Sequence, residues 1–206
     1  MKTFLFLGDS ITDSHRLWQP ENNGLGNGYV KILSDIAMKK SFPDIYINKG
    51  HDGFTLPALY RNLPTDCYPC HPDFVTILIG INDIAAARNS NLSFEPETFA
   101  LQYDELLNQV LAHTRAKLLC MAPFIFPHPQ EFSLWIPDII QAEKAISDLT
   151  EKYSLPFVPL HNYLNDAASK KGYSKITLDG IHLTPLGHRL IALRWLKTVT
   201  KYFSQE

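Results

Sequence analysis

Hydrophobic residues along this chain form two kinds of pattern, short continuous runs and longer stretches with helical spacing. A short continuous run is typical of a strand that is buried on both faces of a parallel sheet. The helical stretches separate the runs, and this alternation predicts βαβ units. We therefore predict an α/β fold, a three-layer α/β/α flavodoxin-like sandwich with a five-stranded parallel sheet. The predicted strands lie near residues 2–7, 44–48, 73–79, 117–122 and 155–159.

Two of the helical stretches are well defined. In the stretch 97–115, apolar residues recur at helical spacing and form one face. A later helix is expected to begin with Thr184 as its N-cap and Pro185 in its first turn, and to end near Phe203. The residues predicted to face inward are Phe99, Tyr103, Leu106, Leu107, Val110 and Leu111 in the first helix, and Leu186, Leu190, Leu193 and Leu196 in the second.

Composition predicts one compact domain. The chain has 206 residues, of which 45% are hydrophobic, and this is enough for a single buried core. No internal repeat, low-complexity tract or linker divides it. We therefore expect residues 1–206 to form one domain.

Charge and hydropathy restrict the partners. The formal net charge is −2, and no basic stripe with interleaved aromatic residues occurs, so we expect no nucleic-acid partner. No apolar stretch approaches the ~20 residues that span a bilayer, so we expect no membrane partner. The first residues lack the apolar core of a secretory leader, which favours a cytoplasmic location. Exposed loop aromatics would suit a homo-oligomer.

The candidate chemistry begins with Ser10. The segment Gly8-Asp9-Ser10-Ile11-Thr12 follows the first predicted strand, which places a hydroxyl at the carboxyl edge of the sheet, where open α/β folds bind their ligands. Near the other end, Asp179 precedes His182 by three residues, so its carboxylate could orient the imidazole. The three residues form a candidate catalytic triad. The alternative is a pair of ordinary turns, with His182 preceding and capping the last helix.

Two further turns could stabilise an oxyanion. The apolar run 74–79 leads directly into Gly80-Ile81-Asn82-Asp83, which places the Asn82 amide at the end of a strand. The run 45–47 leads toward Gly53, whose backbone N–H could approach a ligand closely. Acyl transfer needs such donors, aimed at the oxygen that becomes negatively charged in the transition state. Taken singly, each segment could be an ordinary strand-to-helix turn.

In these four blocks the sequence resembles the SGNH, or GDSL-type, serine hydrolases, and the resemblance covers nearly the whole chain. It implies the SGNH hydrolase fold, with Ser10 as nucleophile and with Asp179 and His182 as the remaining catalytic residues. It also implies that the oxyanion is bound by the Ser10 N–H, the Gly53 N–H and the Asn82 side chain. No metal or organic cofactor is implied.

A finer resemblance concerns Gly8 to Asp13, Arg16 and the segment Leu25-Gly26-x-Gly28-Tyr29-Val30. These segments are similar to bacterial members of the family that remove acetyl groups from xylose-based and related carbohydrates. The implied activity is that of a serine esterase acting on short-chain acyl esters, with a small-molecule ester as substrate. The alternative is a lysophospholipase or thioesterase acting on longer acyl chains. Candidate substrate contacts are Asp9, Asp13, Arg16, Asp52 and Trp135, and Asp52 replaces the small residue that the family usually has before this glycine.

Two regions lie outside these blocks. Residues 123–137 contain four prolines, three phenylalanines and Trp135, and they form either the wall of a substrate pocket or a stiffened connection. The sequence Cys67-Tyr68-Pro69-Cys70-His71 matches the pattern for covalent haem attachment and could also contribute to a zinc site. This remote alternative competes with a chance cysteine pair in a polar loop.

Overall fold

The structure, a computed structural model, describes residues 1–18, 20–40 and 44–203. Its described part contains a five-stranded parallel sheet with the strand order β2-β1-β3-β4-β5. This confirms the predicted α/β fold. The strands are β1 (Thr3–Gly8), β2 (Ile45–Gly50), β3 (Phe74–Leu78), β4 (Lys117–Met121) and β5 (Phe157–Val158).

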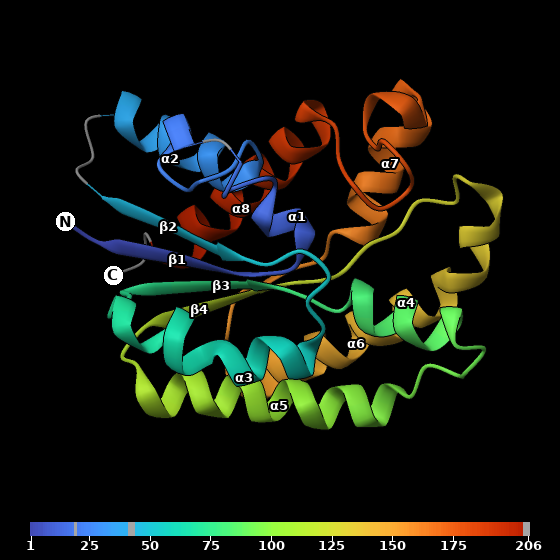
Figure 1. Ribbon diagram of the computed structural model, residues 1–206, viewed down its shortest axis with the longest axis horizontal. Coiled ribbons are helices and arrows are strands. Elements are labelled where there is room, and N and C mark those ends of the chain that lie inside the picture. Colours follow the sequence, from blue (N-terminus) through green and yellow to red (C-terminus); the bar gives the residue numbers. More distant parts are fainter. Residues whose placement is uncertain (19, 41–43, 204–206) are drawn as a thin grey trace.

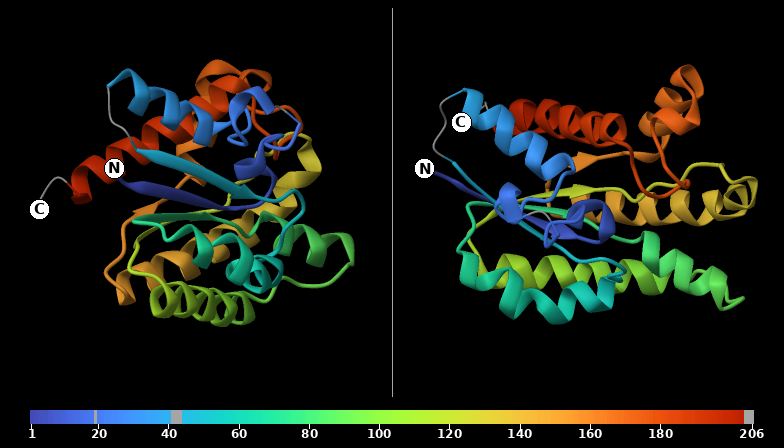
Figure 2. Two further views of the ribbon diagram at one scale, coloured as in Figure 1. Left: turned by 60° about the vertical axis from the view of Figure 1, so that its left-hand side comes forward. Right: turned by 45° about the horizontal axis from the view of Figure 1, so that its top comes forward.

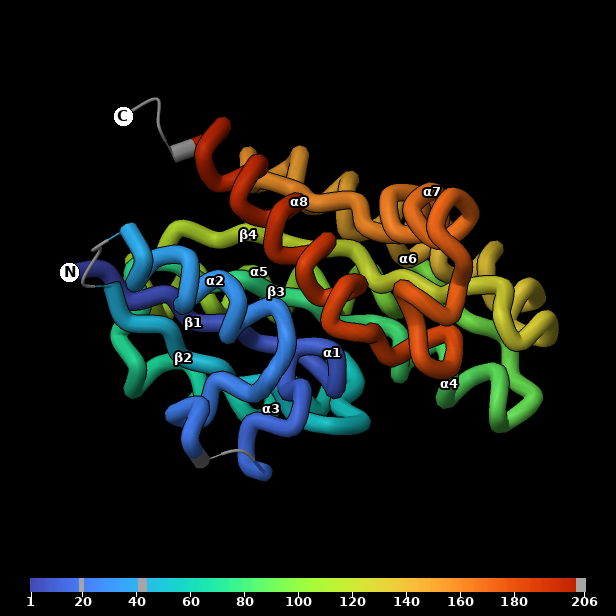
Figure 3. The backbone as a smooth tube through the Cα atoms, turned by 90° about the horizontal axis from the view of Figure 1, so that it is seen from above, coloured from blue at the N-terminus to red at the C-terminus, as the bar shows by residue number. Residues whose placement is uncertain are grey.

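Helices cover both faces of the sheet and produce three layers (Figures 1 and 2). The view from above shows α2 and α8 lying side by side over one face (Figure 3). Four short 3-10 helices are also described. The face covered by α2 (Tyr29–Lys39) and α8 (Pro185–Phe203) also carries α1 (Ser10–Asp13) and α7 (His161–Lys171). The opposite face carries α3 (Leu56–Asp66), α5 (Pro96–His113) and α6 (Ile136–Lys152), with α4 (Ile81–Asn89) toward the carboxyl end of the sheet. The 3-10 helices are η1 (Pro20–Asn22), η2 (Tyr68–Cys70), η3 (Gln130–Trp135) and η4 (Tyr173–Lys175).

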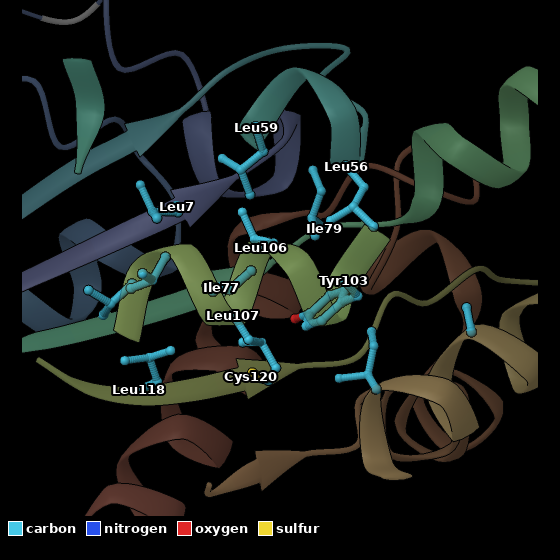
Figure 4. Packing of buried hydrophobic residues seen from close by; sticks show 14 of the residues in the cluster. Leu7, Leu56, Leu59, Ile77, Ile79, Tyr103, Leu106, Leu107, Leu118 and Cys120 are labelled. Carbon is cyan, nitrogen blue, oxygen red and sulfur yellow. The ribbon is translucent and has the colours of Figure 1, made fainter. Parts of the chain in front are cut away.

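The alternating side chains of β1 build two hydrophobic clusters, one on each face of the sheet. Leu5 and Leu7 join the cluster beneath α3 and α5, part of which is shown in Figure 4. Phe4 and Phe6 join the cluster beneath α2 and α8. A strand that is buried on both faces explains why β1 reads as a continuous apolar run.

The helix predictions hold with two exceptions. Thr184 caps α8 as expected, because its Oγ1 accepts a hydrogen bond from the Gly187 N–H at 3.2 Å. Leu193 was predicted to face inward, but 48% of it is exposed. The buried face of α8 instead contains Trp195, whose indole N–H donates to Thr76 Oγ1 in β3 at 2.9 Å and sets the rotation of the helix. In α5 the predicted face is buried except for Leu111, which is 37% exposed.

Residues 123–137 enter the core before they form η3. Phe124 and Phe126 join the cluster beneath α2 and α8, and Ile125 joins the other cluster. The first part of this segment is therefore buried on both sides and continues the direction of β4 rather than forming an exposed loop.

Candidate active site

The end of β1 positions Ser10 as the first residue of α1, at the carboxyl end of the sheet (Figure 1). Asp9 is the N-cap, and its Oδ1 accepts a hydrogen bond from the Ile11 N–H at 3.0 Å. The turn has no space for a side chain at Gly8, because a Cβ atom there would lie 2.3 Å from the Leu78 carbonyl oxygen. The glycine therefore permits the sharp change from strand to helix that presents the Ser10 hydroxyl.

The structure brings Ser10, His182 and Asp179 into one hydrogen-bonded chain. His182 Nε2 lies 3.1 Å from Ser10 Oγ, and His182 Nδ1 lies 2.6 Å from Asp179 Oδ2. Because a carboxylate only accepts, the partners assign the proton of a neutral imidazole to Nδ1 and leave the Nε2 lone pair for the Ser10 hydroxyl. This arrangement can withdraw a proton from Ser10 as its oxygen attacks a carbonyl carbon.

Hydrogen bonds keep the Asp179 carboxylate charged. Asp179 Oδ1 also accepts from the Ile181 N–H at 2.9 Å and from the His182 N–H at 2.7 Å. Partial burial by itself raises the pKa of Asp179, but the bonds from the His182 ring and the two N–H groups outweigh it, so the pKa lies below its usual value. An ionised Asp179 holds the imidazole in place and would stabilise it after it takes a proton.

The segment after β4 supports this turn. The Phe126 N–H donates to the Gly180 carbonyl oxygen at 2.9 Å. A Cβ atom at Gly180, whose φ is +97°, would lie 2.3 Å from the His128 carbonyl oxygen. Close packing of the two backbones therefore fixes the position of Asp179 and His182, a role that the sequence did not reveal for residues 123–132.

The two candidate oxyanion donors come together through Phe54. The Asn82 side-chain amide donates to the Phe54 carbonyl oxygen at 3.0 Å, which ties the start of α4 to the loop that carries Gly53. An amide NH₂ group has a second hydrogen that this bond does not use. Gly53 adopts a φ of +72° in an exposed position, and the space beside its Cα is open.

A cavity of about 580 Å³ opens beside Ser10 and His182. Asp13 and Asp52, two of the candidate substrate contacts, line it, and Asp52 is exposed. Trp18, Leu178 and Pro185 add apolar surface.

Ser14, Asn27 and His188 also line the cavity, and sequence reasoning did not assign them to the site. The Ser14 hydroxyl donates to Asn27 Oδ1 at 2.7 Å and lies 3.4 Å from His188 Nε2. A Cβ atom at Gly28 would lie 2.7 Å from Ser14 Oγ, so the glycine leaves room for this group. In the sequence, the glycines at positions 26 and 28 were the signal that the backbone passes close to other atoms of the protein here.

The family assignment follows from comparison with known proteins. Residues 6–190 match the GDSL-like lipase/acylhydrolase family. The chain belongs to this family. It is therefore a carboxylic ester hydrolase, in agreement with the resemblance of the four blocks.

Individual relatives of this GDSL-like hydrolase agree with the assignment. An acetylxylan esterase of Geobacillus stearothermophilus is 25% identical over 205 residues, which cover 95% of this chain and 92% of the relative. The crystal structure of Axe2, an acetylxylan esterase of the same organism, has a TM-score of 0.85 at 22% identity and matches 96% of this chain and 94% of its own. LAE5, an α/β hydrolase from the metagenome of Lake Arreo in Spain, has a TM-score of 0.84 at 22% identity with the same coverage. At this level of identity the two structures establish the fold.

Asp9 does not reach the cavity of this hydrolase. Only 1% of the residue is exposed, and its carboxylate caps α1. Burial raises the pKa of Asp9 to about 7, and the nearby Asp83 carboxylate adds to this effect. The prediction that Asp9 contacts substrate disagrees with this burial, because a side chain that caps a helix inside the protein has no free surface.

Arg16 is likewise bound by the protein itself. Its Nε lies 2.6 Å from the Gly50 carbonyl oxygen and 3.1 Å from Asp13 Oδ1, and one of its terminal nitrogens lies 3.3 Å from His51 Nδ1. Arginine only donates, so His51 Nδ1 must accept, and the ring proton lies on Nε2, 2.7 Å from Asp66. Arg16, expected at the substrate, instead ties α1 to the end of β2.

Trp135 lies at the start of α6, away from the cavity. Its ring packs against Phe132 at a centroid distance of 4.8 Å and borders the core cluster beneath α3 and α5. It is not among the residues that line the cavity beside Ser10. Its selection as a substrate contact assumed that residues 123–137 wall the pocket, whereas the structure shows them in the core and beneath the Asp179 turn.

The cysteine pattern does not form an exposed ligand pair. Cys67 is completely buried in the core cluster, and this burial raises the pKa of its thiol to about 12. The Cys70 thiol donates to the Asp66 carbonyl oxygen at 3.3 Å. Covalent attachment of haem or binding of zinc would require Cys67 to leave the core, so the packing disfavours this alternative. In residues 1–18, 20–40 and 44–203, no group of three or more His, Cys, Asp or Glu residues is arranged to hold a metal ion.

No helix in the described part of the chain is long and apolar enough to cross a membrane.

Proposed function

We propose that this protein is a serine esterase that removes short acyl groups, above all acetyl, from carbohydrates. The observation that carries the proposal is the chain of hydrogen bonds from Ser10 Oγ through His182 to Asp179, with distances of 3.1 and 2.6 Å. The acetylxylan esterase relative supports the substrate class. Catalytic mutants of Axe2 replace a serine, an aspartate and a histidine, the same three residue types that meet here.

In the proposed mechanism, Ser10 Oγ attacks the ester carbonyl carbon while His182 Nε2 takes the hydroxyl proton. The carbonyl oxygen becomes negative and is bound by the N–H groups of Ser10 and Gly53 and by the Asn82 amide. His182 then gives its proton to the departing alcohol oxygen as the carbon–oxygen bond breaks, which leaves Ser10 acylated. Water repeats the sequence, frees the acid and restores Ser10.

We also propose that residues 1–206 act as a single catalytic domain in the cytoplasm. The free thiols of Cys67, Cys70 and Cys120 support this location, because reducing compartments preserve such thiols. A cytoplasmic esterase would act on small acetylated sugars rather than on an intact polymer.

The test is hydrolysis of a 4-nitrophenyl ester series from acetate to decanoate, with Ser10→Ala as the variant. We expect the highest kcat/KM for acetate to butyrate, and a fall of about 10³-fold or more in Ser10→Ala, because removal of a nucleophile leaves only binding and oxyanion stabilisation. Circular dichroism checks that the variant is folded. Activity of Ser10→Ala equal to wild type would reject the mechanism, and preference for octanoate or longer would favour a lysophospholipase or thioesterase.

A further inference from the structure

The direction of proton transfer assigns the cavity beside Ser10 to one part of the substrate. If the proposed function holds, on which this inference rests, His182 protonates the oxygen of the departing alcohol, so the alcohol must lie on the side of His182. The cavity of about 580 Å³ is lined by His182, Leu183 and Pro185, but by neither Gly53 nor Asn82. It is therefore an alcohol subsite rather than an acyl pocket.

The charges along this cavity have one sign. Asp13, Asp52 and Asp179 line it, and no lysine or arginine does so in the described part of the chain. Asp13 is paired with Arg16 at 3.1 Å, whereas Asp179 accepts a hydrogen bond from the His182 ring at 2.6 Å and keeps its charge. Asp52 forms no ion pair within residues 1–18, 20–40 and 44–203, and it is exposed. Asp52 thus adds a negative charge that no ion pair balances, beside the charge of the catalytic Asp179.

Another part of the lining, formed by Ser14, Asn27 and His188, is polar and carries no positive charge. His188 is only 6% exposed, and burial lowers its pKa to about 4, so the imidazole is neutral at pH 7. Its Nδ1 has no hydrogen-bond partner. Ser14 links this ring to Asn27, which is exposed in the cavity and has no acceptor for its amide nitrogen among the described residues. Hydrogen-bonding groups without a cation suit an alcohol that is rich in hydroxyls.

We propose that Asp52 is a specificity-determining residue that selects the charge of the departing alcohol. The carboxylate accepts hydrogen bonds from hydroxyls of a neutral alcohol and repels an alcohol that carries a carboxylate or phosphate. Sugars without acidic groups are therefore preferred over uronic acids and phosphorylated alcohols. The same charge disfavours lysophospholipids, whose alcohol carries a phosphate near the scissile ester.

The experiment compares two acetate esters with leaving groups of similar size, the anionic 4-acetoxybenzoate and the neutral 4-acetoxybenzamide. The quantity measured is the ratio of kcat/KM for the anionic ester to kcat/KM for the neutral ester. In Asp52→Asn we expect this ratio to rise about threefold to tenfold over wild type at low salt, the size expected of one charge several ångströms away in a hydrated cavity. Any effect of Asp52 on the oxyanion of both esters cancels in the ratio.

Asp166→Asn is the matched control, because it removes one exposed carboxylate on α7, outside the cavity lining. It should leave the ratio at the wild-type value. Added salt should raise the ratio in wild type and in Asp166→Asn, and should raise it less in Asp52→Asn, because ions screen exposed charges.

An Asp52→Asn ratio equal to that of wild type would overturn the inference while leaving the esterase intact. Loss of hydrolysis of both esters in folded Asp52→Asn would also overturn it, because Asp52 would then serve the reaction itself. A wild-type protein that hydrolyses neither of these esters nor the nitrophenyl series would overturn the proposed function, and the charge selection with it.

Discussion

The serine side and the histidine side of the site differ in how far exposed side chains take part in holding them. Behind Ser10, backbone packs on backbone: a Cβ atom at Gly50 would lie 2.1 Å from the Asp13 nitrogen, and the buried Asn48 amide donates to the Thr12 carbonyl oxygen at 2.7 Å. The side chain of His182, by contrast, is 46% exposed in a turn that rests on hydrogen bonds and on the segment after β4. A change in the packed backbone behind Ser10 should therefore impair folding, whereas a change to the exposed side chain of Asp179 or His182 should impair the reaction alone.

The largest expected effect is on the histidine side. Asp179→Asn keeps an oxygen that can accept from the Ile181 and His182 N–H groups, so the turn is retained. The amide NH₂ cannot accept from His182 Nδ1, so the ring shifts its proton to Nε2 and no longer accepts from Ser10. We expect kcat to fall about 10³- to 10⁴-fold, as for loss of the orienting carboxylate of a triad.

The free energy of unfolding should change by less than about 1 kcal/mol in Asp179→Asn, because the residue is half exposed. Steady-state kinetics and urea denaturation of the same preparation measure both quantities. An inactive protein that has also lost several kcal/mol of stability would show that the histidine side is not independent of folding.

On the serine side the expected effect is on stability. Gly50→Ala places a methyl group 2.1 Å from the Asp13 nitrogen, and this backbone cannot move without shifting α1. We expect a loss of about 3 kcal/mol in the free energy of unfolding, the upper part of the range for overpacking.

Gly53→Ala is the matched control for this prediction. No atom lies within 4 Å of the added methyl group, so the only cost is that of an alanine at a φ of +72°. We expect this cost to lower the free energy of unfolding by about 1 kcal/mol. Urea denaturation compares the two variants. Equal losses would contradict the claim that close packing, and not glycine conformation, holds α1 in place.

The same contrast explains what the sequence could predict. The central strands β1, β3 and β4 were predictable because they are buried and leave continuous apolar runs, whereas the edge strands β2 and β5 leave only short ones. Ser10, Asp179 and His182 were recognisable because they belong to short local motifs at strand and turn ends. Local patterns carry both kinds of information.

Contacts between distant segments that no motif marks were not predictable. In the group formed by Ser14, Asn27 and His188, Ser14 and His188 are 174 positions apart in the chain. Their contact depends on how α8 packs beside α2. The same limit applies to Arg16, whose partners on β2 and in the loop beyond it became visible only in three dimensions. It also applies to Leu193, since the hydrogen bond of Trp195 decides which face of α8 is buried.

The smallest expected effect is on the pH dependence of stability, and it sharpens the contrast between the carboxylates of Asp9 and Asp179. Asp179 has a lowered pKa on the exposed side, whereas burial raises the pKa of Asp9 to about 7 on the serine side. In the unfolded chain Asp9 ionises near its ordinary value of 3.8, and in the folded protein it does so only near 7. The unfolded state therefore releases its proton first, so the stability from this group is complete below about pH 4 and is lost as pH rises to 7.

Asp9→Asn removes this titration and keeps an oxygen that can cap α1. Between pH 5 and pH 7 we expect the variant to gain about 2 kcal/mol of unfolding free energy relative to wild type. Urea denaturation at several pH values measures the difference, and Asp148→Asn, which removes an exposed carboxylate on α6, should follow the wild-type curve. Parallel curves for Asp9→Asn and wild type would mean that Asp9 is hydrated in solution, and that the serine side is less closed than its packing indicates.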